Sequence, residues 1–230
     1  MRMRKKKNFD VRLERAGARL VKEPFDNKGK WNTVFGNDNP IHIEIGSGKG
    51  HFIMGMAQKY PDINFIAVDV IPDVILMGLE LTNNEDLPNL RFMIADASLM
   101  GDIFVKGEID RIYLNFSDPW KKKKQAKRRL THQNFLDVYK KIIKTKGQIW
   151  FKTDNRGLFE FSLNSFSADR DYIMSDISLD LHSSDFHINE NVMTEYETKF
   201  SEMGMPIHRL VATLLTDTNN ITGESANDNK

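Results

Sequence analysis

The fold is decided by residues 41–50, which read IHIEIGSGKG. Apolar and polar side chains alternate over residues 41–45, a period of two that is typical of a β-strand. The glycines at positions 46, 48 and 50 then indicate a tight loop. Apolar residues at helical spacing follow over residues 52–60 and stop before Pro61, which favours a helix. A strand, a glycine loop and a helix in this order form the first unit of an α/β fold.

The same alternation of strand and helix continues along the chain. We predict strands over residues 64–70, 90–96, 109–116 and 148–153, and helices over residues 72–81, 132–144 and 157–166. Thr131 stands where it could cap the helix at 132–144. Two more strands, 172–182 and 207–215, follow with no long helix predicted between them. The sequence therefore predicts a mostly parallel sheet with helices on both faces, finished by an antiparallel pair.

Length and composition exclude several classes of protein. The 230 residues, 40% of them hydrophobic, suit one large α/β domain or at most two small ones. The absence of cysteine from the sequence excludes disulfide scaffolds, thiolate zinc sites and cysteine nucleophiles, and we expect no metal. No stretch approaches the roughly 20 apolar residues of a membrane span, and no apolar segment of a secretory signal follows the basic N-terminus, so we expect a soluble, cytoplasmic protein.

We divide the chain by composition into three parts. Residues 1–38 are predicted to be a basic N-terminal extension, residues 39–215 the α/β domain, and residues 216–230 a frayed tail. Positive charge is concentrated at two places, although the net charge is only +1. Residues 2–7 hold five bases and residues 121–129 (KKKKQAKRR) hold seven, together twelve of the 33. A local basic surface of this kind attracts phosphate.

Acidic residues stand at the ends of the predicted strands. In open α/β sheets, ligands bind beyond the carboxyl ends of the strands. One carboxylate belongs to each of the first five strand ends: Glu44, Asp69, Asp96, Asp118 and Asp154. A single aspartate at such a place is commonly a turn former. Five in succession repel one another, which favours a cationic or donor-rich ligand between them.

The glycine loop narrows the choice of ligand. It lacks the third glycine of a dinucleotide fingerprint, because residue 51 is His, and it is not a phosphate-binding P-loop. A glycine loop between carboxylates suits S-adenosylmethionine, which has a positive centre and hydroxyl groups, better than a generic nucleotide. We expect the loop at Gly46 to approach the amino-acid end and Glu44 to meet the ammonium group. Asp69 would then bind the ribose diol, and Asp96 would accept from the adenine amino group.

The fourth strand ends in a segment that suits a nucleic-acid base. Residues 115–120 (NFSDPW) combine polar acceptors, a proline and an aromatic ring, which can hold a flat base by stacking and hydrogen bonding. The basic run at 121–129 follows at once. Beside a cleft, we interpret this run as a segment that contacts phosphates.

Four separated motifs stand in order along the chain: YLNFSDPW (113–120), KRRLT (127–131), FKTDNRGLFEFSL (151–163) and TEYETKF (194–200). Together they resemble the bacterial tRNA (guanine-N7-)-methyltransferases, and the resemblance runs from about Lys28 to Arg209. It implies a class I S-adenosylmethionine-dependent methyltransferase fold, which is Rossmann-like with a mostly parallel seven-stranded sheet, and makes residues 39–215 the methyltransferase domain. It also implies S-adenosylmethionine as donor and N7 of a guanosine in the variable loop of tRNA as acceptor.

The resemblance further implies roles for individual residues. The donor-site acids are Glu44, Asp69, Asp96 and Asp118, with Asp118 as the catalytic residue. Matched to substrate contacts are Lys122, Asp154, Thr194, Glu195, Tyr196 and Glu197. The RNA-interacting segment comprises Lys124, Gln125, Ala126, Lys127, Arg128 and Arg129.

Two other functions and the oligomeric state stay open at this point. Residues 118–120, Asp-Pro-Trp, are similar to the D-P-P-W motif of adenine-N6 methyltransferases, although only one proline is present. The other alternative is a non-catalytic RNA-binding module that keeps the fold. Against this alternative, a protein without activity has no need of paired charges in a cleft. The sequence is compatible with a monomer or a homodimer.

Overall fold

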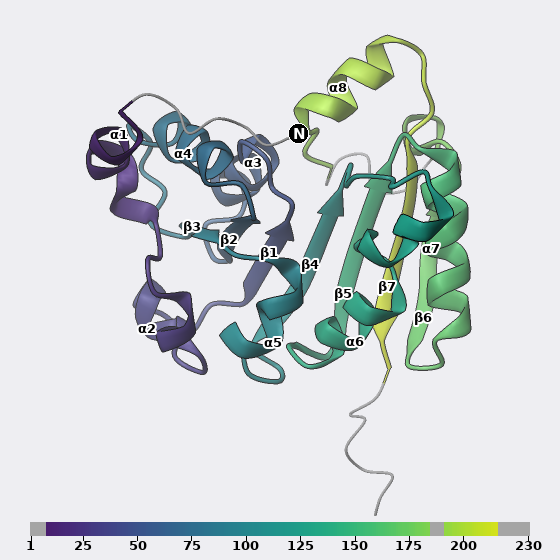
Figure 1. Ribbon diagram of the computed structural model, residues 1–230, viewed down its shortest axis with the longest axis horizontal. Coiled ribbons are helices and arrows are strands. Elements are labelled where there is room, and N and C mark those ends of the chain that lie inside the picture. The colour runs from purple at the N-terminus through teal and green to yellow at the C-terminus, as the bar shows by residue number, and fades with distance from the viewer. Residues whose placement is uncertain (1–7, 185–190, 216–230) are drawn as a thin grey trace, which may run out of the picture.

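The computed structural model describes residues 8–184 and 191–215 and contains one seven-stranded sheet (Figure 1). The strand order is β3-β2-β1-β4-β5-β7-β6. The strands are β1 (Ile41–Ile45), β2 (Asn64–Asp69), β3 (Leu90–Ile94), β4 (Ile109–Asn115), β5 (Ile143–Thr153), β6 (Tyr172–Ser178) and β7 (His208–Leu214). Strands β1 to β5 pair in parallel, and β7 runs antiparallel between β5 and β6. The predicted α/β fold with a final antiparallel pair is confirmed.

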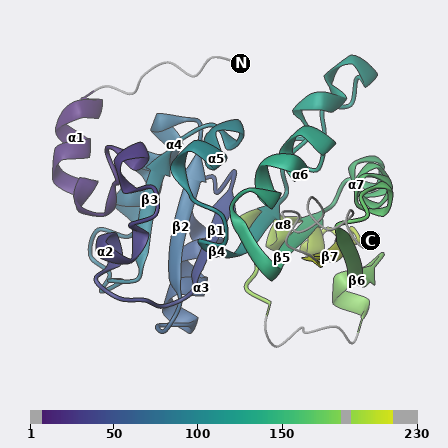
Figure 2. The same ribbon diagram turned by 90° about the horizontal axis from the view of Figure 1, so that it is seen from below.

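Helices cover both faces of the sheet and bury two apolar clusters. One cluster packs α1 (Phe9–Ala16), α3 (His51–Lys59) and α4 (Pro72–Leu81) against β2 and β3. The other packs α2 (Trp31–Phe35), α5 (Met100–Ile103), α6 (Gln133–Lys140) and α7 (Arg156–Ala168) against the opposite face. In the view from below, α6 and α7 lie on one side of β5, β7 and β6 (Figure 2). Cover on both faces explains why β2 is a nearly continuous apolar run.

Short 3₁₀ helices and one further α-helix complete the fold. The 3₁₀ helices are η1 (Gly17–Arg19), η2 (Pro24–Asn27), η3 (Ala97–Leu99), η4 (Lys123–Arg128) and η5 (Leu181–Ser183). The further helix, α8 (Glu195–Glu202), lies above the end of β4 in Figure 1. Among the described residues, no helix has the length and apolar character needed to cross a membrane.

The segment before β1 has more structure than its polar sequence indicated. The Trp31 side chain is fully buried, stacks on Phe104 at 4.9 Å between ring centroids, and donates from Nε1 to the carbonyl of Ile103 at 3.2 Å. On α1, Arg12 donates to both carboxylate oxygens of Glu80 on α4. A few such anchors hold this segment, and they give no periodic signal in the sequence. The basic residues 2–7 and the predicted tail 216–230 lie outside the described residues.

The predicted boundary between helix 132–144 and strand 148–153 is wrong. The helix α6 ends at Lys140, and β5 begins at Ile143, where it pairs with Ile109 through an irregular register. The predicted cap, Thr131, is fully buried, and its hydroxyl shares a hydrogen bond of 2.7 Å with that of Ser162. The cap is His132 instead, whose Nδ1 accepts from the backbone of Asn134.

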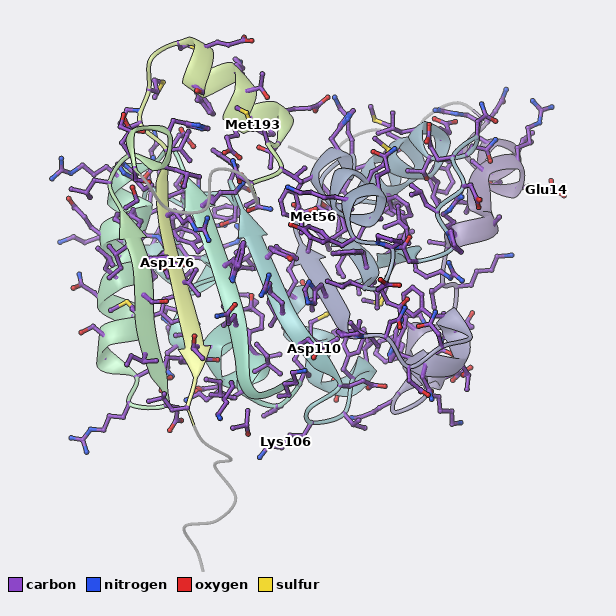
Figure 3. All side chains as sticks on the ribbon, turned by 180° about the vertical axis from the view of Figure 1, so that it is seen from behind. Glu14, Met56, Lys106, Asp110, Asp176 and Met193 are labelled. Carbon is purple, nitrogen blue, oxygen red and sulfur yellow. The ribbon has the colours of Figure 1, made fainter. Side chains whose placement is uncertain are left out.

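The two ends of the sheet carry different polar groups. At the lower end, Asp110 accepts from the backbone N–H of Ile41 at 2.8 Å and pairs with Lys144, which fixes the start of β1. Figure 3 shows Asp110 near this end and Met193, next to α8, at the opposite end. At the lower end, Asp110 is already paired within the protein, whereas the end beside α8 carries the glycine loop and the acidic residues.

Gly78 lets α4 approach the sheet and the glycine loop closely. A Cβ at this position would lie 2.6 Å from Phe92 Cε1 and 2.9 Å from the carbonyl oxygen of Lys49. Gly78→Ala should therefore lower the free energy of unfolding by about 1–3 kcal/mol, measured by urea denaturation, although alanine is the better helix former.

The matched control is Gly101→Ala in α5, where the nearest atom to a Cβ is Lys141 Cδ at 3.5 Å. This variant should change the free energy of unfolding by less than about 1 kcal/mol. An equal loss of stability in both variants would contradict the close approach of α4.

Candidate active site

The glycine loop turns sharply between β1 and α3. Gly46, Gly48 and Gly50 all have positive φ, at 77°, 57° and 79°, a conformation that other residues rarely adopt. The backbone N–H groups of Gly46 and Ser47 donate to the carbonyl of Val68 at 2.8 and 3.0 Å, which ties the loop to the end of β2. A Cβ at Gly48 would meet nothing within 4 Å, so the outer surface of the loop is open to a ligand.

Glu44 places a carboxylate below this loop, inside the sheet. Its side chain is only 2% exposed, and Oε1 accepts from Asn115 Nδ2 at 2.9 Å. The other oxygen, Oε2, is buried and has no hydrogen-bond partner among the described residues. Burial raises the pKa of Glu44 to about 8, and the charge of Asp69 raises it further. The Asn115 hydrogen bond, the charge of Lys152 and the backbone N–H of Ile53 oppose this rise. The position therefore favours a ligand that brings a hydrogen-bond donor or a positive charge.

Asp69 and Asp118 act on the same region. Asp69 ends β2 and accepts from the backbone of Gly48 at 3.1 Å and of Ile71 at 2.9 Å. Burial raises the pKa of Asp69, its backbone hydrogen bonds oppose this, and the charge of Asp118 raises it further. The electric field of Asp118 thus reaches Asp69, although Asp118 itself is exposed in the segment after β4.

The remaining predicted acids lie at the same edge of the sheet. Asp96, exposed two residues beyond β3, accepts through Oδ1 from the backbone and hydroxyl of Ser98 at 2.8 and 2.7 Å. Asp154 is half-buried directly after β5. The five acids therefore belong to the ends of five neighbouring strands: Glu44 and Asp69 lie within the last residues of β1 and β2, and the other three lie just beyond β3, β4 and β5.

A small pocket of about 80 Å³ opens between the glycine loop and α8. Its lining includes Glu44, residues 46–52, Asn115, Phe116 and Thr194–Tyr196. Of the five acids, only Glu44 is among the described residues that line this pocket; Asp69, Asp96, Asp118 and Asp154 lie outside the lining. The pocket brings the predicted donor residues Glu44 and Gly46 together with the predicted substrate residues at the start of α8.

The start of α8 is fixed by a capping box. Thr194 Oγ1 accepts from the backbone of Glu197 at 2.9 Å, and the Glu197 carboxylate reaches back to the backbone N–H of Thr194. The Thr-x-x-Glu spacing in the sequence is the signal that could have predicted this helix. Glu197 is fully buried, whereas Glu195 and Tyr196 are exposed. The four predicted substrate residues at the start of α8 therefore divide into Thr194 and Glu197, which shape the helix, and Glu195 and Tyr196, which face outward.

Two residues that the sequence analysis did not predict hold Glu195 beside the glycine loop. Lys49 Nζ lies 3.1 Å from Glu195 Oε2, and His51 Nε2 lies 2.9 Å from Glu195 Oε1. Both come from the loop and the first turn of α3. No pattern in the sequence relates Lys49 to Glu195, because the contact spans 146 residues.

Most of the basic run after β4 forms the 3₁₀ helix η4 (Lys123–Arg128). Lys122, Lys124, Lys127 and Arg128 are exposed, whereas Gln125 and Ala126 are half-buried. Together with the exposed Lys121 and Lys123, these four bases form a basic surface on η4 and just before it, next to the acidic strand ends.

Two arginines of this run contact the protein itself. Arg129 donates to the carbonyls of Pro119 and Trp120 at 3.0 and 3.1 Å and lies over the ring of Phe161. The guanidinium of Arg128 lies 3.5 Å from the centroid of Trp120 and covers one face of the ring that was expected to stack on a base. Arg129 therefore positions the segment, and Trp120 is partly occupied by a neighbouring side chain.

No group of three or more His, Cys, Asp or Glu that could hold a metal ion exists within residues 8–184 and 191–215.

The sequence of the chain is similar to those of known methyltransferases. A family model described as a putative methyltransferase matches residues 38–210. A tRNA (guanine-N(7)-)-methyltransferase of Listeria monocytogenes is 52% identical over 212 residues, which are 92% of this chain and 98% of that protein. A protein of the same description from Bacillus subtilis is 50% identical over 209 residues, 91% of this chain and 97% of that protein.

Solved structures give the same result for the fold alone. The 16S rRNA methyltransferase KamB has a TM-score of 0.60 at 10% identity and covers 82% of this chain and 94% of its own. The antibiotic-resistance methyltransferase Kmr has a TM-score of 0.56 at 14% identity, with 83% and 93% covered. These similarities confirm the class I methyltransferase architecture.

Proposed function

The chain belongs to the tRNA (guanine-N(7)-)-methyltransferase family, and we propose that it transfers the methyl group of S-adenosylmethionine to N7 of a guanosine in the variable loop of tRNA. The observation that carries this proposal is the row of carboxylates around the glycine loop, with a basic 3₁₀ helix beside it. The carboxylates suit a cationic donor, and the basic helix suits an RNA backbone. Since tRNA is the substrate, we also infer that the enzyme acts in the cytoplasm.

The residues of the pocket fit the methyl donor, which supplies an electrophilic methyl group on a positively charged sulfur. The buried Glu44 Oε2 needs a donor or a cation, and the ammonium group of the amino-acid end provides both. The open space at Gly48 allows backbone groups to approach that end of the molecule. We assign the ribose diol to Asp69, and the adenine amino group to the oxygen of Asp96 that does not bind Ser98.

Transfer of the methyl group to guanine N7 requires little chemical assistance from the protein. The nitrogen already has a lone pair in the plane of the base, so no proton has to leave N7 before the methyl group is transferred. Positive charge passes from sulfur to the imidazole part of guanine as the reaction proceeds. Catalysis then consists of in-line positioning and of carboxylates placed where the charge develops. We assign this electrostatic role to Asp118, whose field extends into the site as far as Asp69.

Recognition of guanine requires acceptors for N1–H and the 2-amino group. We assign this role to Asp154, at the end of β5, because a carboxylate can accept from both groups and adenine offers neither in that arrangement. Tyr196 presents a 58% exposed ring at the pocket, where it lies alongside Phe116 at 6.3 Å between centroids. Glu195 and Tyr196 are therefore better placed to touch the base than Thr194 and Glu197. Lys122 lies at the start of the basic surface and is assigned to the adjoining phosphate.

A product analysis of Asp118→Asn tests the proposed chemistry. The wild-type protein, incubated with tRNA and S-adenosylmethionine, should yield 7-methylguanosine on nuclease digestion. Asp118→Asn should lower kcat by about 100-fold or more because a charge that stabilises the transition state is lost. Donor affinity, measured by calorimetry, should fall much less because Asp118 is exposed. Near-normal kcat in the variant would contradict the role of Asp118, and N6-methyladenosine as product would establish the alternative function.

Salt dependence tests the basic surface. Replacing Lys122, Lys124, Lys127 and Arg128 together by Gln should weaken tRNA binding at 0.1 M salt by about 10- to 1000-fold and reduce the slope of log Kd against log salt concentration. Donor binding should be unchanged, because none of the four lines the pocket.

The control replaces four exposed lysines elsewhere on the chain, Lys22, Lys30, Lys141 and Lys146, and so removes the same net charge. It should leave the tRNA affinity within about threefold of the wild type. An equal loss in both variants would show that only net charge matters and would contradict an RNA contact at η4.

A further inference from the structure

A lysine is buried at the junction between the donor pocket and α8. Lys152 lies in β5, and its side chain is only 7% exposed. Its ammonium donates to Glu197 Oε2 at 2.6 Å, to Asn191 Oδ1 at 2.9 Å and to the carbonyl of Val192 at 3.3 Å. It also lies 5.2 Å from the centroid of Phe52, a residue of the pocket lining. One ammonium group thus joins the sheet to three residues of the segment before and within α8.

The carboxylate of Glu197, which binds Lys152, also contacts other groups around the start of α8. Glu197 is fully buried, and its Oε1 accepts from Asn191 Nδ2 at 2.5 Å and lies 3.3 Å from His182 Nε2. Its Oε2, bound to Lys152, also closes the capping box with the backbone of Thr194. The position of Thr194, and with it that of Glu195 and Tyr196, is therefore set by the contact between Glu197 and Lys152.

We propose that Lys152 is a positioning residue for methyl transfer, which holds the start of α8 against the donor pocket so that Glu195 and Tyr196 face the target guanosine. This inference rests on the function proposed above. Lys152 does not touch the substrate; it acts through Glu197, Asn191 and Val192.

Stability alone does not account for such an arrangement. A buried ion pair loses the hydration of both charges and commonly contributes no more to stability than well-packed apolar side chains would. The three acceptors of the Lys152 ammonium group, by contrast, fix one position of residues 191–197, because only that position satisfies the ammonium group. Two of these acceptors, Asn191 and Val192, lie outside α8, so the lysine also fixes the chain that leads into the helix.

Lys152 also connects α8 to the donor site. The charges of Lys152 and Glu44 act on each other, and Lys152 opposes the effect of burial that raises the pKa of Glu44. The ammonium group of Lys152 thus binds the carboxylate of Glu197 in α8 and acts electrostatically on the carboxylate of Glu44 in the pocket. This placement suits a group that keeps donor and acceptor in one geometry.

The test compares Lys152→Met with the matched control Lys140→Met. Lys140 is a partly buried lysine of α6 that pairs with Asp169 at 2.8 Å and Asp171 at 2.9 Å, away from the pocket lining. Methyl transfer is measured over a range of tRNA concentrations, donor Kd by calorimetry, and Tm by circular dichroism. Lys152→Met should lower kcat/KM for tRNA by about 100-fold, the effect of a small displacement of a positioning group. Its donor Kd should rise by less than about tenfold, and Lys140→Met should keep kcat/KM within about threefold.

A second variant separates positioning from stability. Lys152→Met combined with Glu197→Gln leaves no uncompensated charge, and glutamine can still close the capping box. We expect this double variant to recover Tm but to keep the low kcat/KM, because Asn191 and Val192 still lack the ammonium group. Should Lys152→Met alone fail to fold, the double variant provides the test by itself.

Two results would overturn the inference: a return of kcat/KM to the wild-type value in the double variant, or an equal loss in Lys140→Met and Lys152→Met. Failure of the proposed function is distinguishable from either. In that case the wild-type protein itself would form no 7-methylguanosine in the same assay, and the inference would fall with it.

Discussion

Negative charge gathered at one edge of a parallel sheet is the constraint on which the site depends. Five neighbouring strands each bring one carboxylate to this edge, and the most deeply buried, Glu44, is 2% exposed. An isolated buried carboxylate is costly, and Asn115 satisfies only one of its two oxygens. The glycine loop above it provides the space through which a cationic ligand can reach the second oxygen. The fold therefore holds an incomplete electrostatic arrangement that a positively charged methyl donor would complete.

The part of the site at α8 depends on a positive charge of the protein itself, the ammonium group of Lys152. Lys152 faces Glu197 on one side and acts on Glu44 on the other, and the start of α8 follows from its contacts. On the outer surface, Lys49 and His51 of the glycine loop hold Glu195 in the same way. The glycine loop and α8 are thus linked both in the protein interior and at its surface. The basic helix η4 lies outside this network, which separates binding of the RNA backbone from the geometry of transfer.

The sequence predicted most of the sheet because its parallel strands have alternating or continuous apolar runs bounded by clear turn residues. The prediction that the five acids lie at one edge of the sheet follows from topology alone. The sequence did not predict that α6 ends at Lys140 and that β5 begins at Ile143, because isoleucine fits a helix and a strand equally well. It also missed the burial of Trp31, the contacts of Lys152 and the pairing of Lys49 with Glu195, because each depends on residues distant in sequence. Arg129 shows the same limit: a run of bases does not reveal which member turns inward.

The most direct test of the central claim is proton release when the donor binds. Burial raises the pKa of Glu44 to about 8, which favours the protonated form in the free protein, and a cation in the pocket favours loss of this proton. Donor affinity should therefore rise between pH 6 and 8, by up to about tenfold per pH unit. Calorimetry at pH 7 in buffers of different ionisation enthalpy should show a proton released on binding of S-adenosylmethionine by the wild-type protein and none from Glu44→Gln. Identical proton release by both proteins would contradict the claim that Glu44 receives the cationic donor.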